Sequence, residues 1–307
     1  MSFKSKIKDY LLFTKFRLTF SVCISAIAGY LLAVPVLKDQ YADSLDITFN
    51  EINFQNIALL FLGGLLVTSA SIGTNQILER KLDSQMVRTE DRPLPAGRMK
   101  LTEAIIATIL MLGLGSWLLY GFNLNTMILG LVSYVSYSYI YTPSKRKTPW
   151  SVIIGAFPGA MPPMIGAVAA TEQGLFTALA GSLFFVQFAW QLPHFWAIAW
   201  VSHDDYQKAD FYLLPSKTGK SKKSAFRISL STLLLIPFSL YPWVLGYVGV
   251  FSVMAATVLG LTFFLFAYQL LLNLDDKSAK ALMFASFIYL PLIQFAYVID
   301  RYFFFTG

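Results

Sequence analysis

Three oxygen-bearing side chains recur at every fourth position around residue 80: Asn75, Glu79 and Asp83. On a helix, residues four apart lie on one face, about 5–6 Å from one to the next. Carboxylate and amide oxygens on one face suit Mg²⁺, which binds one or two carboxylates together with substrate phosphates. The spacing therefore indicates a magnesium site. The alternative interpretation is a solvated helix end with incidental charges, although Asn75 falls inside an apolar run, where an amide without a partner is unfavourable.

Basic residues follow these acids closely. Arg88 comes first, and Arg92 then opens the proline-rich turn 92–98. Guanidinium groups match the geometry of phosphate oxygens. Acidic ligands beside arginines predict a metal-diphosphate substrate. Further along the chain, Lys145, Arg146 and Lys147 form a run of three cations. They are candidates to hold a phosphate or a propionate, and the alternative is a plain positively charged anchor.

A second acidic stretch, residues 203–210, contains Asp204, Asp205 and Asp210 and follows an apolar run, as the first one does. Both stretches are expected at the same side of the molecule. Carboxylates at a membrane boundary are costly unless they are used. The two acidic stretches are therefore candidates to share one site.

His194 lies in an otherwise apolar segment, directly after Pro193. A proline inside a helix removes one backbone hydrogen bond and can kink the helix towards a cavity. Two interpretations of His194 stay open: a hydrogen-bonded interior side chain, or a ligand or acid–base group.

The elements that must position these residues are membrane helices. Of 307 residues, 56% are hydrophobic and 13% are charged, and the mean hydropathy is +0.59. Soluble domains carry roughly 25% charged residues, so this chain is an integral membrane protein. The single cysteine, Cys23, rules out a disulfide scaffold. The net charge of +7 is expected to mark cytoplasmic loops and not a nucleic-acid partner.

A membrane helix needs about 20 mostly apolar residues. The runs are continuous and not alternating, which favours helices over the strands of a membrane β-barrel. We therefore expect an all-α integral membrane protein, a nine-transmembrane-helix bundle formed as one domain by residues 1–307. The expected spans are 16–36, 56–78, 101–122, 126–142, 150–170, 175–200, 226–246, 248–272 and 280–300.

Basic residues test this count. With nine spans, all of the 24 Lys and Arg residues fall on the amino-terminal side, except Lys38 and Arg301. Cytoplasmic loops carry an excess of Lys and Arg. The distribution predicts a multi-pass protein with a cytoplasmic amino terminus. The location that we expect for it is the bacterial inner membrane.

The ordered motifs resemble those of the UbiA-type intramembrane prenyltransferases. Asn75, Glu79 and Asp83 match the first motif of that family, N-x3-D-x3-D, with Glu in the middle place. Over roughly residues 10–300 the chain is most similar to the haem-prenylating branch, through segments 88–94, 141–149, 159–166, 190–195 and 205–215. The second motif departs from D-x3-D, because Asp205 is followed by Lys208 and Ala209, and Asp210 comes one place late.

The resemblance implies a reaction. In it, farnesyl diphosphate binds with Mg²⁺ between the two motifs, pyrophosphate leaves, and a vinyl group of haem b attacks the allylic cation before water completes the product. Implied partners are farnesyl diphosphate, haem b, the lipid bilayer and a downstream haem A synthase. The implied ligands of Mg²⁺ are Asn75, Glu79, Asp83 and Asp205. The implied substrate contacts are Arg88, Arg92, Lys145, Arg146, Tyr206 and Lys208, with His194 assigned to haem contact or proton handling.

Two other functions remain as alternatives. A related enzyme would prenylate an aromatic acid for quinone synthesis. A secondary transporter also has many helices and membrane carboxylates, but it usually places them near the midplane, within repeated halves. Here the acids are expected at one boundary, and no convincing repeat is visible.

Overall fold

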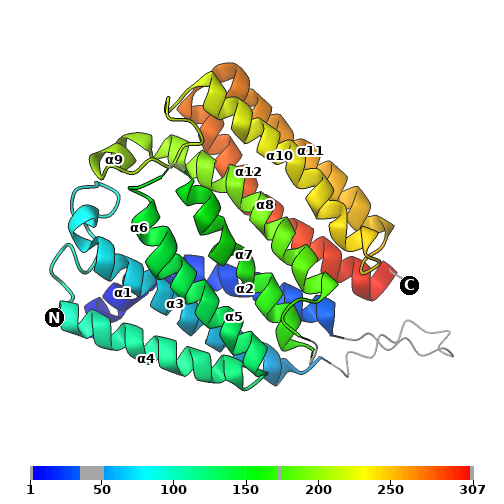
Figure 1. Cartoon of the computed structure of the whole chain (residues 1–307), viewed down its shortest axis with the longest axis horizontal. Helices are drawn as coiled ribbons and strands as arrows, with labels where there is room; N and C mark the ends of the chain where they lie inside the picture. The colour runs from blue at the N-terminus through cyan, green and yellow to red at the C-terminus, as the bar shows by residue number, and fades with distance from the viewer. Residues whose placement is uncertain (1–2, 35–51, 149, 172–173, 305–307) are drawn as a thin grey trace.

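A computed structural model of the chain describes residues 3–34, 52–148, 150–171 and 174–304, and this part of the chain contains helices and no strand. The helices pack side by side into an elongated bundle (Figure 1). In chain order they are α1 (Phe3–Phe13), α2 (Phe16–Ala33), α3 (Phe54–Asp83), α4 (Leu101–Tyr120), α5 (Leu124–Val135), the π-helix η2 (Ser136–Tyr141), α6 (Thr142–Ser144), α7 (Ser151–Ala169), α8 (Ala178–Val201), α9 (His203–Lys208), α10 (Lys222–Val244), α11 (Val250–Asn273), α12 (Asp276–Ile299) and the π-helix η3 (Asp300–Phe304).

Local sequence explains where many of these helices begin. A side-chain oxygen in front of a helix accepts hydrogen bonds from its first free N–H groups. Asn53 does this for α3, and the other long helices with such a cap are α5 (Asn123), α8 (Thr177), α10 (Ser221) and α12 (Asp275). The caps fix helix starts that hydropathy alone leaves uncertain by several residues.

The all-helical membrane class is confirmed. Seven helices in the described ranges are long and apolar enough to cross a membrane: α2, α3, α4, α7, α10, α11 and α12 extended by η3. The expected span 126–142 is helical but divided into α5, η2 and α6. The expected span 175–200 coincides with α8, a continuous helix whose apolar sequence is interrupted by polar Gln187, Gln191 and His194. Crossing of the membrane by these two segments stays a prediction.

Contacts between connecting segments sort into two ends of the bundle. At one end, Asp9 pairs with Arg98 (2.8 Å), the Arg88 N–H donates to Asp205 (3.3 Å), and Lys220 pairs with Asp276 (2.8 Å). At the other end, Asn123 donates to the Val168 carbonyl (3.0 Å) and Tyr302 to the Leu31 carbonyl (2.9 Å). Successive connections alternate between these ends, as Figure 1 also shows. The end with the Arg88–Asp205 contact is called the basic end below.

Helix α7 lies at the centre of the bundle, between α2, α5 and α8. It touches α2 backbone to backbone. A Cβ atom at Gly166 would lie 1.8 Å from the Ala26 carbonyl oxygen, and one at Gly29 would lie 2.0 Å from that of Pro163. Small residues allow such approach where lipid gives no hydrophobic force between helices. The expectation that the Gly- and Pro-rich fifth run supports close helix contact is confirmed.

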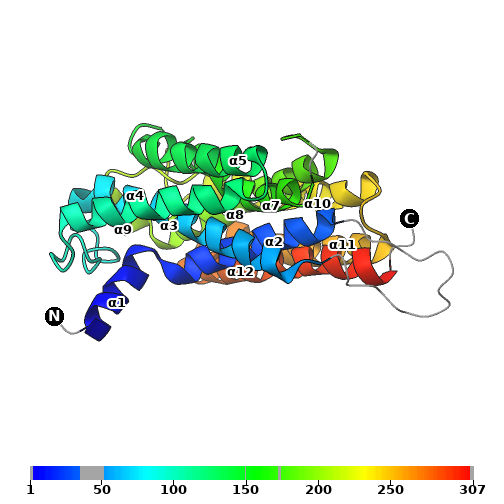
Figure 2. The same ribbon diagram turned by 90° about the horizontal axis from the view of Figure 1, so that it is seen from below.

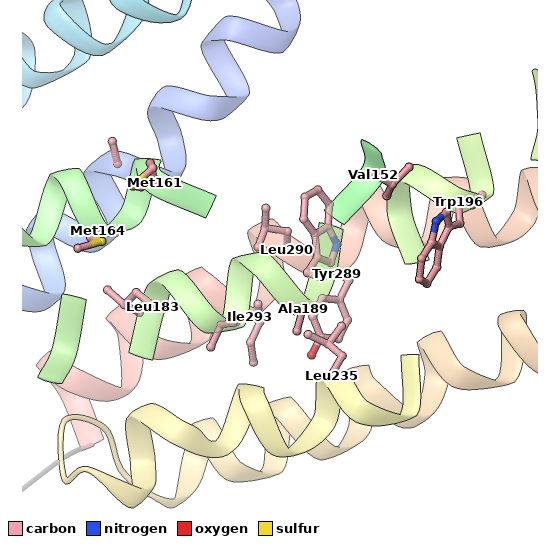
Figure 3. Packing of buried hydrophobic residues seen from close by; sticks show 14 of the residues in the cluster. Val152, Met161, Met164, Leu183, Ala189, Trp196, Leu235, Tyr289, Leu290 and Ile293 are labelled. Atoms are coloured by element: carbon pink, nitrogen blue, oxygen red, sulfur yellow. The ribbon is translucent and has the colours of Figure 1, made fainter. Parts of the chain in front are cut away.

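The apolar core continues from α7 through α8 to α10 and α12. Figure 3 shows Leu183, Ala189, Leu235 and Ile293 packed between these helices. A chain of buried amides crosses the same region: Gln294 donates to Gln187 (3.0 Å), and Gln187 donates to the Gly159 carbonyl (2.8 Å). Interhelical hydrogen bonds of this kind fix the relative position of membrane helices.

The contact between α2 and α7 yields a stability prediction. Gly166→Ala should destabilise the protein by about 1–3 kcal/mol, because overpacking against backbone cannot relax easily. Gly181→Ala, on α8, meets nothing within 4 Å and should be neutral or stabilising, since alanine is the better helix former. Thermal unfolding of both variants in one detergent measures the difference. Equal unfolding temperatures would contradict the close contact.

Candidate functional site

The first acidic motif lies on the last turns of α3. This helix extends to Asp83, five residues beyond the expected boundary at 78, so Asn75, Glu79 and Asp83 share one continuous helix. Their exposed fractions are 2%, 5% and 1%. The alternative of a solvated helix end is therefore wrong for these three residues, which face the interior of the basic end.

Glu79 is paired with a lysine from another element. The Lys145 ammonium, just after α6, donates to both carboxylate oxygens at 2.9 Å. The Asn75 amide donates to Glu79 at 2.8 Å and to the Thr142 hydroxyl at 3.1 Å. Burial acts to lower the pKa of Lys145, but the charge of Glu79, its hydrogen bond to the ammonium and the nearby Tyr137 and Tyr206 together outweigh burial, and the pKa is raised. Lys145 therefore stays charged.

Asp83 has a second cation as its partner. The Arg92 guanidinium donates to Oδ2 at 2.6 Å, and the segment that carries Arg92 is tied back by the Thr89 hydroxyl, which donates to the Asp83 carbonyl (2.8 Å). The other carboxylate oxygen, Oδ1, is buried and has no hydrogen-bond partner. A buried unpartnered oxygen is unfavourable, so it is open to a further ligand.

The second acidic motif contacts the segment between α3 and α4 at the surface of the protein. Asp205, on α9, accepts from the Arg88 backbone N–H (3.3 Å) and from the Lys208 ammonium (3.1 Å). These hydrogen bonds, the one from Lys208 first, lower the pKa of Asp205. The Arg88 guanidinium lies over the Tyr206 ring, 4.7 Å from its centre.

Aromatic residues join the two motifs. The Lys145 ammonium lies 5.5 Å from the centre of the Phe211 ring, and Phe211 lies 6.0 Å from Tyr206. The Tyr212 N–H also donates to the Lys145 carbonyl (3.2 Å). The structure thus gathers both acidic motifs and most of the expected substrate contacts at one end of the bundle.

Two candidate residues lie apart from this cluster. Arg146 is exposed and lies 3.7 Å from Asp210, another exposed side chain. His194 is buried between α8 and α12, where its Nδ1 lies 2.7 Å from the Ser286 hydroxyl and its ring stacks on Trp190. This packing agrees with the interpretation of a hydrogen-bonded interior histidine. A role in haem contact stays a prediction.

Lys15 is the residue that sequence reasoning missed. It lies between α1 and α2 with a left-handed backbone (φ 46°), which is unusual for a residue other than glycine. Burial lowers the pKa of Lys15 to about 7, with further contributions from the positive charges of Arg92 and Lys145. No hydrogen bond or ion pair joins its ammonium to any residue that the structure describes. The signal in the sequence is a lysine between Phe13 and Phe16, which the distribution of basic residues reports only as a marker of topology.

The donor set fits Mg²⁺ only with help from a substrate. Within the described ranges, no group of three His, Cys, Asp or Glu side chains is close enough to hold a metal. Asn75, Glu79 and the open oxygen of Asp83 remain as oxygen donors, while Asp205 is engaged elsewhere. Mg²⁺ typically combines one or two carboxylates with phosphate oxygens and water, so this set is sufficient.

A mixed site of buried carboxylates and cations at one end of a helical bundle is what a diphosphate-metal substrate requires. The sequence matches the model of the UbiA prenyltransferase family over residues 22–290, and the chain belongs to that family. The protohaem IX farnesyltransferase of Cytophaga hutchinsonii is 42% identical over 97% of this chain and 99% of its own length. The protohaem IX farnesyltransferase of Christiangramia forsetii is 43% identical, over 97% and 95%. The resemblance expected from the motifs is confirmed.

Solved structures share the fold. A digeranylgeranylglyceryl phosphate synthase superimposes with a TM-score of 0.75 at 20% identity, over 97% of this chain and 99% of the other. A UbiA homolog from Archaeoglobus fulgidus bound to GPP and Mg²⁺ gives a TM-score of 0.60 at 14% identity, over 94% and 99%. At these identities the likeness concerns the fold alone.

The buried pair of Glu79 and Lys145 yields a prediction. Glu79→Leu should destabilise the protein by about 3–5 kcal/mol, because it leaves a buried charge without a partner. The double variant with Lys145→Leu should recover most of that loss, since neither charge remains. Unfolding of the four proteins of this cycle in detergent measures the coupling. Additive effects would show that the pair does not contribute as one unit.

A contact between the Lys15 ammonium and a bound diphosphate can be tested separately from the effect of Lys15 on folding. Lys15→Gly removes the charge but suits the left-handed backbone, so the protein should remain at least as stable. We expect its affinity for inorganic pyrophosphate to fall by about tenfold or more, the range for a charge-assisted contact.

The pH dependence supplies a control for this variant. A lysine with pKa near 7 is charged below pH 7 and neutral above it in the free protein. The wild-type protein should therefore bind pyrophosphate more tightly than Lys15→Gly by the largest factor below pH 7, and this factor should shrink as the pH rises. Titration calorimetry at several pH values measures it, and a constant factor would exclude this role of Lys15.

Proposed function

We propose that this prenyltransferase transfers the farnesyl group of farnesyl diphosphate to a vinyl group of haem b and releases pyrophosphate. The observation that carries the proposal is the cluster at the basic end, where buried Glu79 and Asp83 meet Lys145 and Arg92. The acceptor is inferred from the relatives named protohaem IX farnesyltransferase, which align with nearly the whole chain.

The cations of the cluster hold the diphosphate in this proposal. Lys145 and Arg92 are now engaged by carboxylates, and Lys15 and the Arg88 guanidinium lie nearby. When the diphosphate enters, its oxygens replace carboxylate oxygens around these cations. Negative charge develops on the leaving pyrophosphate, and fixed cations in a site without bulk water stabilise that charge strongly.

Mg²⁺ is the cofactor that we assign to Asn75, Glu79 and Asp83. When bound, it supplies a Lewis acid that neutralises charge on the departing pyrophosphate. The open oxygen of Asp83 supports this assignment, and so does the Archaeoglobus fulgidus homolog that was solved with Mg²⁺ and GPP. Asp205 remains a candidate ligand from the opposite side of the site.

The acceptor side is assigned to residues around the basic end and to His194, which is buried between α8 and α12. Tyr206, Lys208 and Arg146 are candidates to contact haem propionates, and His194 is a candidate for haem contact or proton handling. The vinyl group attacks the farnesyl cation, and water then adds to give the hydroxyethylfarnesyl side chain. Apolar helices keep bulk water from the cation until that step. A haem A synthase is the proposed receiver of the product.

We also propose that residues 1–307 form one membrane domain that crosses the bacterial inner membrane nine times with a cytoplasmic amino terminus. The alternation of connecting segments between two ends supports this count. The grouping of nearly all Lys and Arg residues at the basic end supports the orientation.

Prenylation of an aromatic quinone precursor is the second candidate within the same class. The shared fold gives it some support, because a solved structure with this fold is named for a different product. Secondary transport is weaker, since the buried carboxylates of α3 gather at one end and not at the midplane.

The decisive experiment is a turnover assay on the purified protein in detergent. Haem b, farnesyl diphosphate and Mg²⁺ are supplied with and without a chelator, and the products are identified by chromatography and mass. We expect a farnesyl-hydroxyethyl haem that disappears with chelator. Prenylation of 4-hydroxybenzoate without any haem product would replace the acceptor and keep the diphosphate site.

A residue-level prediction accompanies the assay. Asp83→Asn should lower kcat by about 10²–10³, as expected for loss of a group that supports charge stabilisation in the transition state. Glu90→Gln is the matched control, because Glu90 is an exposed carboxylate of the next segment. Wild-type turnover in a folded Asp83→Asn protein would remove Asp83 from the metal site.

A further inference from the structure

Helix α1 has two faces of different character. One face is fixed to the bundle: Lys6 pairs with Glu103 at 2.8 Å, and Asp9 pairs with Arg98 at 2.8 Å. The other face is open. It exposes 46% of Ile7, 46% of Leu11 and, at its edge, 41% of Leu12. The exposed side chains of Lys4 and Lys8 lie on this open face as well, since Lys4 is three residues from Ile7 and Lys8 is three residues from Leu11.

This helix does not cross the membrane. Its 11 residues span about 16 Å, half of the hydrocarbon thickness of a bilayer. Figure 2 shows α1 leaving the bundle at an angle to the long helices. Its open face continues into the exposed apolar side chains of α2, including Phe16 and Phe20. An apolar face flanked by lysines at the end of a membrane bundle is typical of a helix in the lipid interface.

A groove lies beside the open face, where the attached side of α1 meets α4. It has a volume of about 610 Å³ and lies between α1 and α4. Tyr10 and Glu103 form its polar end, where the Tyr10 hydroxyl donates to Glu103 at 2.8 Å. Ile106 and Leu110 of α4 form its apolar wall. Lys6 pairs with Glu103 and balances its charge, so this polar end, joined to an apolar wall, is complementary to a lipid with its headgroup at α1 and its acyl chain along α4.

We infer that α1 and this groove form a docking surface for anionic phospholipid, with Ile7 and Leu11 in the acyl region and Lys4 and Lys8 at the headgroups. Lysine stems can lie along apolar surface while the ammonium stays at the interface. Each lysine near an anionic membrane surface adds to the attraction. This inference concerns the membrane surface and does not depend on the acceptor or the metal proposed above.

The docked helix is connected to the site. Arg98, which holds Asp9 of α1, also binds Asp91 (2.7 Å), one residue before the Arg92 that holds Asp83. Lys15 lies two residues after the end of α1. Lipid docking of α1 therefore fixes the two segments that carry Lys15 and Arg92.

The test uses the full-length protein in lipid nanodiscs of phosphatidylcholine, with and without phosphatidylglycerol. A bimane probe is attached at Ile7→Cys in a Cys23→Ala background, and its fluorescence is quenched by lipids with a nitroxide on the acyl chain. Glu90→Cys gives the matched reference, because Glu90 is an exposed side chain of the connecting segment at the same end. We expect strong quenching at position 7, increased by phosphatidylglycerol, and little at position 90.

Charge recognition is tested by two matched double variants. Lys4→Gln/Lys8→Gln should lower the ratio of docked to undocked helix by about thirtyfold in discs with phosphatidylglycerol. Lys222→Gln/Lys223→Gln removes two exposed lysines at the start of α10 and should leave the quenching at position 7 unchanged.

Three outcomes would overturn the inference. A probe at position 7 that is not quenched in either lipid would place the open face in water. Quenching that is equal with and without phosphatidylglycerol would exclude recognition of anionic lipid. Disulfide cross-linking between two unlabelled Ile7→Cys chains, with loss of quenching at position 7, would assign the face to a second copy of the protein.

Discussion

The structure depends on the pairing of charges that are buried at the end of an apolar bundle. An ionised carboxylate that leaves water needs a partner or a metal, because the cost of burying an isolated charge is large. Helix α3 brings Glu79 and Asp83 inside, and the rest of the basic end is built to meet them. Lys145 comes from the end of α6 and Arg92 from the segment before α4. Segments distant in sequence converge there because each supplies one part of the compensation.

This arrangement also explains why the same end is suited to chemistry. Carboxylates held by cations form a neutral cluster that is stable without a ligand. A diphosphate can take the place of the carboxylates around the cations, and its metal can take the place of the cations beside the carboxylates. The open oxygen of Asp83 and the unengaged ammonium of Lys15 are the two positions where the cluster is incomplete, one negative and one positive.

Sequence alone predicted much of this molecule. Apolar runs located the long helices, because membrane helices bury their polar backbone within each segment and therefore appear as continuous runs. The four-residue spacing placed Asn75, Glu79 and Asp83 on one face, and α3 confirms that. The division of the fourth run at η2, the interfacial helix α1 and the approach of Lys15 to the site were not predicted. They depend on tertiary packing and on a left-handed backbone, which neither hydropathy nor spacing reports.

The amide chain from Gln294 through Gln187 to Gly159 has a consequence for how the protein is made. Its side-chain partners are 107 residues apart in the sequence. Helices α7 and α8 are synthesised well before α12, so Gln187 has its Gly159 acceptor early but lacks the amide donor of Gln294 until the last helix arrives. The central packing of α8 against α12 is therefore completed only near the end of translation. The earlier helices wait in the bilayer as a partial bundle, whose interior polar groups are the binding surface for the final one.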